Sequence, residues 1–143
     1  MEKIVINGGR SLEGRVKVDG MKNAAVAVIF ASIVTRGVCV IDNLPDINDV
    51  RISLEILRSL GASVKKTGDT SVEIDTSSVE NRCAPRELVG SMRASYYLVG
   101  AMLSRFGETC VCLPGGCDFG NRPIDQHLKA FRALGADAAI EGE

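Results

Sequence analysis

The sequence lacks several features that mark particular classes of protein. It has no excess of charge of one sign, since it holds 17 basic and 18 acidic side chains with a formal net charge of -1. A protein that grips nucleic-acid phosphates needs a basic surface, so this balance argues against that class. No apolar run reaches the roughly 18 residues of a membrane span, and the first residues show no signal-peptide pattern. We expect a cytoplasmic protein without nucleic-acid or membrane partners.

Cysteine and histidine do not have the number or spacing of a disulfide framework or a metal site. The five cysteines are an odd number, which favours free thiols in a reducing compartment. Cys110 and Cys112 would share one face of a strand, but no second pair has zinc spacing, so we expect no metal and no cofactor. The single histidine, His127, could pair with Cys117, although no third orienting residue is recognisable. A hydrogen-bonded structural histidine is the stronger interpretation.

Apolar spacing along the 143 residues predicts an α/β protein in which helices alternate with short strands. The predicted strands cover residues 3–7, 14–19, 38–41, 62–66, 71–75 and 109–113, and the predicted helices cover 22–34, 50–60, 88–103 and 124–134. Residues 62–66 and 71–75 are expected to form a hairpin, and the strand at 14–19 to be half-buried. The hydrophobic fraction of 45% suits such a globular core.

An internal repeat is the clearest architectural signal in the sequence. The segment 57–62 reads LRSLGA and recurs at 131–136 as FRALGA. Helix, strand and helix thus return with a period of roughly 70 residues, which is too long for short solenoid repeats. Because the last unit has no closing strand, we expect the chain to be a fragment of a longer repeat-built protein.

The segment 113–123, LPGGCDFGNRP, is expected to be a loop that presents a thiol. Its glycines and prolines exclude a regular element and permit a close approach to a ligand. Arg122 and a helix beginning near Pro123 would both favour an anion beside Cys117 and lower the pKa of this thiol. A reactive cysteine that faces an anionic substrate is one interpretation. A tight turn with an incidental cysteine is the other.

Three motifs together resemble the UDP-N-acetylglucosamine 1-carboxyvinyltransferases: KNAA at 22–25, MRAS at 92–95, and the cysteine loop at 114–123. The resemblance implies an inside-out α/β barrel with two domains, each built of three helix-and-sheet units. Residues 1–20 would pair with the other domain, and 21–143 would form one unit and a truncated second. The related 3-phosphoshikimate enolpyruvyl transferases share this fold but lack the cysteine loop, and they are the distant alternative.

The same resemblance implies an activity, in which an enolpyruvyl group passes from phosphoenolpyruvate to the 3-hydroxyl of UDP-N-acetylglucosamine and phosphate is released. This is the first committed step of peptidoglycan synthesis. Cys117 matches the family's acid and nucleophile, the group that fosfomycin alkylates. Lys22 matches the phosphoenolpyruvate-binding lysine and Arg122 a loop arginine that contacts the anionic groups. Asn23 and Arg93 match further substrate-binding residues, Arg93 near the phosphates.

The chain also lacks residues that the resemblance would require. The family's acidic base for the sugar hydroxyl, and a further arginine for the phosphoenolpyruvate carboxylate, lie beyond residue 143. Without them the two substrates cannot be enclosed, so we expect the 143 residues alone to be inactive. The alternative is a non-catalytic module that binds anions or pairs with a complementary fragment. Unfilled strand edges would favour self-association of such a piece.

Overall fold

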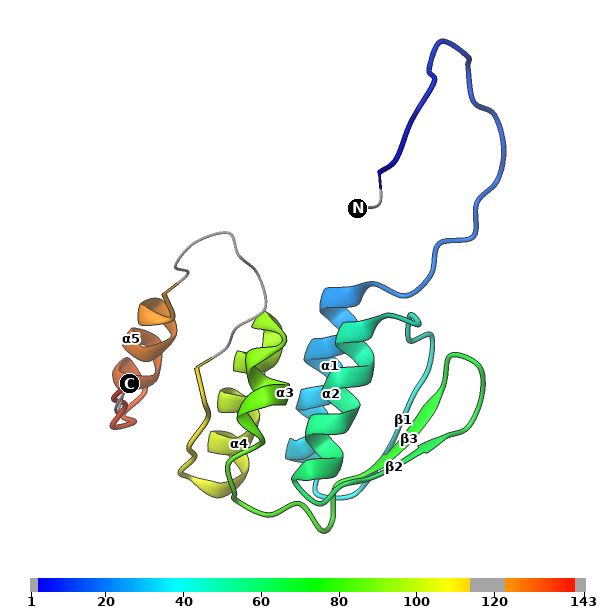
Figure 1. Cartoon of the computed structure of the whole chain (residues 1–143). Coiled ribbons are helices and arrows are strands. Elements are labelled where there is room, and N and C mark those ends of the chain that lie inside the picture. The colour runs from blue at the N-terminus through cyan, green and yellow to red at the C-terminus, as the bar shows by residue number, and fades with distance from the viewer. Residues whose placement is uncertain (1–2, 114–122, 141–143) are drawn as a thin grey trace.

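The computed structural model describes residues 3–113 and 123–140, in which helices cover one side of a small sheet (Figure 1). The elements are α1 (Lys22–Thr35), β1 (Val38–Ile41), α2 (Asn48–Ser59), β2 (Ser63–Lys66), β3 (Val72–Asp75), α3 (Arg86–Gly90), the 3-10 helix η1 (Arg93–Tyr96), α4 (Tyr97–Phe106) and α5 (Asp125–Ala133). This is a partial α/β fold, as predicted. Among these helices, none is long and apolar enough to cross a membrane.

The three strands form an antiparallel sheet in the order β1-β3-β2. The predicted hairpin of β2 and β3 is confirmed, and the first unit closes when β1 pairs with β3, Cys39 opposite Ile74. Because side chains alternate along a strand, Ile74 is fully buried against the helices while Val38 and Val40 lie on the other face. These two valines are 61% and 59% exposed, so the sheet is covered on one side only.

Helix α1 is the centre of the core. Its side chains are apolar nearly all round, a composition typical of a helix buried among neighbours. It contacts α2, α4 and β1, and Figure 1 shows it behind α2. Val26, Ile29 and Ile33 are fully buried, whereas Val28 and Val34 remain about half exposed, at 49% and 47%. The packing of α1 therefore leaves part of its apolar surface uncovered.

The single long helix expected over 88–103 is wrong. The chain forms α3, then the turn η1, then α4, and Met92 has extended backbone angles between them. The Ser95 hydroxyl lies 2.8 Å from the Val89 carbonyl oxygen and 2.7 Å from that of Met92. Serine side chains compete in this way with backbone hydrogen bonding and stabilise turns. The apolar spacing continues through the break, and for that reason it predicted an uninterrupted helix.

The strands expected over 3–7, 14–19 and 109–113 are also wrong within the described part of the chain. A strand needs a neighbour that accepts and donates hydrogen bonds, and these extended segments have none among residues 3–113 and 123–140. Val16 and Val18, expected on a half-buried face, are 88% and 83% exposed. Val111 and Cys112 do pack against the core, so the last segment keeps its inward-facing side chains.

The repeated segments end two helices in the same way. In the first, the Ala62 amide donates to the Leu57 carbonyl at 3.0 Å, and in the second Ala136 donates to Phe131 at the same distance. Each turn passes through a glycine with positive φ, 104° at Gly61 and 92° at Gly135, which is the Schellman end of a helix. The internal repeat is therefore a repeat of backbone geometry as well as of sequence.

Candidate active site

Several helices present their N-terminal ends to one end of the molecule. Figure 1 shows α1, α2 and α4 with their first turns at the same end of the helical layer. The N-termini of α1 and α2 carry partial positive charge and free amide groups, which together attract anions, whereas α4 continues directly from η1 and its first amide donates to the carbonyls of Ala94 and Ser95. Among the described residues, no side chain caps the first turn of α1 or α2, so the N–H groups of these turns remain available to a ligand. This end of the helical layer suits a phosphate or a carboxylate.

Lys22 and Asn23 occupy the first turn of α1, as predicted, and both are exposed. The chain enters this turn through Gly20, which lies against the backbone of Asn43. A Cβ added to Gly20 would lie 1.8 Å from the Asn43 carbonyl oxygen, so only glycine permits this approach. The close contact fixes where α1 starts. It therefore fixes where the Lys22 side chain begins.

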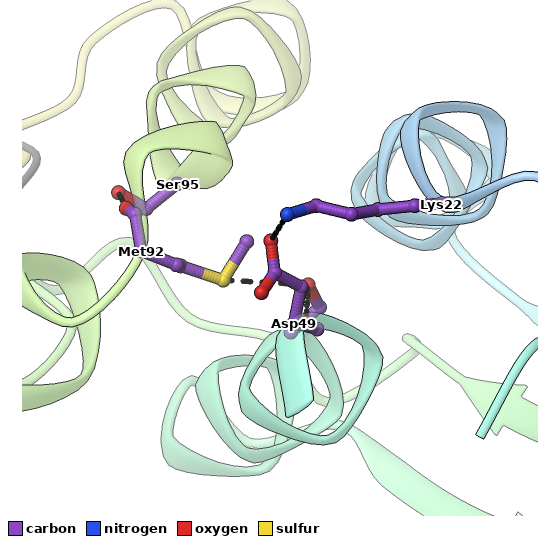
Figure 2. Close-up of polar contacts among 5 residues, drawn as sticks. Lys22, Asp49, Met92 and Ser95 are labelled. Atoms are coloured by element: carbon purple, nitrogen blue, oxygen red, sulfur yellow. Dashed lines mark hydrogen bonds and ion pairs between the residues drawn. The ribbon is translucent and has the colours of Figure 1, made fainter. Parts of the chain in front are cut away.

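The Lys22 ammonium is held by an acidic residue that the sequence did not single out. Its Nζ lies 2.5 Å from Oδ2 of Asp49, which belongs to the first turn of α2 (Figure 2). The Asp49 side chain is 25% exposed and that of Lys22 is 54% exposed. An acidic residue immediately before the helix predicted over 50–60 was the available signal. The sequence could not indicate that the two first turns lie side by side.

A short chain of contacts joins this pair to the turn that carries Arg93. The Ser53 hydroxyl donates to the Asp49 carbonyl oxygen at 2.7 Å, and its oxygen lies 3.7 Å from Sδ of Met92. Met92 is buried, and the partly buried Arg93 follows it at the start of η1. Its guanidinium carbon lies 5.9 Å from the ring centre of Tyr96. Lys22 and Arg93 thus lie on elements that contact one another, since α1 contacts both α2 and η1.

His127, in the first turns of α5, contacts the same region through an aromatic ring. Its ring centre lies 4.6 Å from that of Tyr96, with the planes inclined by 58°. A hydrogen bond to Tyr97 and burial raise the pKa of Tyr96, while the nearby Arg93 charge lowers it. The His127 contact thus suits a structural role. The predicted residues Cys117 and Arg122 lie outside the described residues.

Three other thiols lie close together where the loop after β3 meets the segment after α4. A hydrogen bond to Cys110, then burial and the charges of Cys110 and Cys112, raise the pKa of Cys83 to about 11. At neutral pH such a thiol is protonated and a poor nucleophile. Within the described residues, no group of three or more histidine, cysteine or acidic side chains is placed to hold a metal ion.

Comparison with known proteins assigns the chain to a family. The model of the EPSP synthase (3-phosphoshikimate 1-carboxyvinyltransferase) family matches residues 6–143. The chain belongs to this family. Among solved structures, it is similar to the enolpyruvyl transferase NikO from Streptomyces tendae, with a TM-score of 0.60 and 34% identity over 70% of this chain and 23% of that one. The enolpyruvyl transferase fold predicted from the motifs is therefore confirmed.

The chain is also similar to curated proteins that share one name. UDP-N-acetylglucosamine 1-carboxyvinyltransferase 3 from Caldanaerobacter subterraneus subsp. tengcongensis is 51% identical over 141 residues, 99% of this chain. UDP-N-acetylglucosamine 1-carboxyvinyltransferases from Streptococcus thermophilus and Streptococcus pneumoniae serotype 2 are 50% and 51% identical over all 143 residues. The chain spans about a third of the length of these relatives, 34% in each case.

Proposed function

We propose that this chain forms part of an enzyme that transfers an enolpyruvyl group from phosphoenolpyruvate to the 3-hydroxyl of UDP-N-acetylglucosamine, with release of phosphate. The observation that carries the proposal is the identity of about half of all positions to proteins of that name, spread over the whole chain. The product would enter peptidoglycan synthesis, and the protein would act in the cytoplasm.

The described geometry supports an anionic substrate at the end of the helices where Lys22 lies. An ammonium has three donors, so Lys22 can keep Asp49 and still donate to a phosphate oxygen. Asn23, in the same first turn, would hydrogen-bond the substrates. Arg93 would add a second cation from η1. The three side chains approach from helix starts, where the peptide dipoles add to the attraction.

Cys117 and Arg122 complete the proposed site from the sequence. The Cys117 thiol would protonate the methylene carbon of phosphoenolpyruvate while the sugar hydroxyl adds to the neighbouring carbon and gives its proton to the acidic base expected beyond residue 143. Phosphate would then leave that carbon as the new methyl group loses a proton, which restores the double bond. Arg122 would stabilise the anionic groups. A thiol is a usable acid near neutral pH, and its thiolate is a good nucleophile toward the epoxide fosfomycin. No metal or cofactor takes part in this proposal.

A second candidate is a non-catalytic piece that binds anions or pairs with a complementary chain. The uncovered apolar side chains favour it, in particular Ile4, Ile6 and Val18 in the unpaired segment and Val38 and Val40 on the sheet. An edge strand with such neighbours is a template for association. Under this alternative the 143 residues alone release no phosphate from phosphoenolpyruvate.

Labelling with fosfomycin tests the cysteine in the chain itself. We expect peptide mass spectrometry to place the adduct on Cys117, with UDP-N-acetylglucosamine increasing its yield, and to leave Cys83 unlabelled because of its raised pKa. The matching experiment uses a chimera in which this chain replaces the corresponding third of the Streptococcus pneumoniae relative. A chimera that remains unlabelled at Cys117 would exclude the reactive-cysteine assignment.

The chimera also tests the activity. We expect it to release phosphate from phosphoenolpyruvate only when UDP-N-acetylglucosamine is present. Cys117→Ser should abolish the release, and Cys110→Ser, which removes another exposed thiol nearby in the sequence, should not. A folded chimera that releases no phosphate would favour the non-catalytic alternative. Phosphate release from the chain alone would overturn the expectation that it is inactive.

A further inference from the structure

The ion pair between Lys22 and Asp49 differs from the other ion pairs of the described chain. The other three join residues two to five positions apart, namely Arg51 with Asp46, Arg58 with Glu55 and Arg82 with Glu80. Lys22 and Asp49 instead belong to different helices. The Asp49 side chain is also the most enclosed of the eight, with 25% of its surface exposed.

We propose that Asp49 is a positioning residue that holds the Lys22 ammonium ready for an anionic phosphate group. The inference rests on the proposed function, which places phosphoenolpyruvate at Lys22. Lysine has a long, mobile side chain, and much rotamer freedom is lost whenever it is fixed on a ligand. A carboxylate that fixes it beforehand removes that cost from the binding step.

The structure gives Asp49 the rigidity that this role needs. Its backbone lies in the first turn of α2, and its carbonyl accepts the Ser53 hydroxyl at 2.7 Å. The oxygen of the same hydroxyl lies 3.7 Å from Sδ of Met92, which is buried just before η1 and labelled in Figure 2. The helix start also favours the carboxylate charge. The backbone of Asp49 is thus fixed by the helix and by Ser53. The Lys22 side chain is more than half exposed to solvent, so a ligand can reach it.

Two possible roles of Asp49, as a repulsive charge and as a positioning residue, predict opposite changes in anion affinity when its carboxylate is removed. If Asp49 acted only as a negative charge near the site, Asp49→Asn would remove a repulsion and tighten the binding of an anion. If it positions Lys22, the same change weakens binding because the lysine must be ordered anew. Freezing one long side chain accounts for about a two- to tenfold change in affinity. The direction of the effect therefore decides between the two.

The test follows the ¹⁵N-labelled lysine ammonium signals of the 143-residue chain by NMR during titration with phosphoenolpyruvate. Lys22→Arg assigns the Lys22 signal. We expect the Lys22 side chain to be restrained in the free chain and its signal to shift on titration. In Asp49→Asn, phosphoenolpyruvate should bind about two- to tenfold more weakly. The matched control is Asp46→Asn, which removes the same charge three positions away from a pair whose side chains are 65% and 79% exposed. It should leave the Lys22 titration unchanged.

Two results would overturn the inference, and they are distinguishable. Equal or tighter binding in Asp49→Asn, with wild-type Lys22 responding to phosphoenolpyruvate, would leave the proposed function standing and remove the role of Asp49. A wild-type Lys22 signal that never responds would instead remove the proposed anion site and the inference with it. Asp49→Glu, which keeps the carboxylate, should recover part of the loss.

Discussion

Replacing Arg105 tests whether its hydrogen bonds hold α4 against α1 and the sheet. Its guanidinium donates to the Ile33 carbonyl at 2.9 Å and the Thr76 carbonyl at 2.8 Å, with two longer contacts at 3.4 Å. It thereby connects α4 with the end of α1 and with the segment after β3. Each hydrogen bond from a charged group contributes roughly 1.5–3 kcal/mol. After a discount for partial exposure, the two short bonds predict a loss of about 2–4 kcal/mol in Arg105→Ala.

Urea denaturation followed by far-ultraviolet circular dichroism measures this loss, and it suits a chain without tryptophan. With an m-value of roughly 2 kcal/mol/M, the midpoint should fall by about 1–2 M. Arg105→Lys should recover less than half, because an ammonium lacks the planar guanidinium, whose second amino nitrogen also lies 3.4 Å from the Ser77 and Val79 carbonyl oxygens. The control is Arg51→Ala, an exposed ion pair worth less than about 1 kcal/mol. If Arg105→Ala cost no more than this control, the reasoning would be refuted.

Four further predictions concern the helix ends, the thiols and the turn between α3 and α4. Gly61→Ala should destabilise the fold by more than about 2 kcal/mol, since the new Cβ would lie 2.6 Å from the Ser78 carbonyl at positive φ, whereas Gly135→Ala meets no atom within 4 Å and should lower the urea midpoint far less. Cys83 should react with iodoacetamide more slowly than a free thiol at pH 8, and Cys110→Ala should accelerate it. Because its pKa is raised on folding, the stability contribution of Cys83 is complete below pH 9 and is lost as pH rises toward about 11, which pH-dependent urea midpoints would detect. Ser95→Ala should cost about 1–2 kcal/mol and increase amide exchange in 92–96, because it removes the buried hydroxyl, whose one hydrogen is shared between the Val89 and Met92 carbonyl oxygens; unchanged exchange would contradict this.

The sequence predicted the first unit well because its pattern is local. The helical spacing around Ile29 and Ile33 and the alternation at Val72 and Ile74 correspond to buried faces of α1 and β3. The Gly61 stop was equally local, since the helix end needs positive φ there. Such features require no knowledge of distant residues.

The errors have one physical origin, which is that the decisive partner lies elsewhere in the chain or outside it. The segments around Val16 and Val111 have strand-like alternation, but a strand exists only when another segment pairs with it. The break at Met92 depends on where the Ser95 hydroxyl finds acceptors. The candidate site shows the same division. Lys22 was predicted from its motif, and its partner Asp49 was not, because only the packing of α1 on α2 brings them together.

The central position of α1 has a consequence for synthesis of the chain. It emerges from the ribosome before its neighbours α2 and α4, as an apolar helix that they have yet to cover. One side of α1 is covered once the chain has been made as far as Thr76. The buried Thr76 hydroxyl lies 3.2 Å from the carbonyl oxygens of both Ser32 and Gly37 and so closes the first unit. The second side stays open for about thirty residues more, until α4 arrives. Nascent chains halted in this interval should be the ones that chaperones hold.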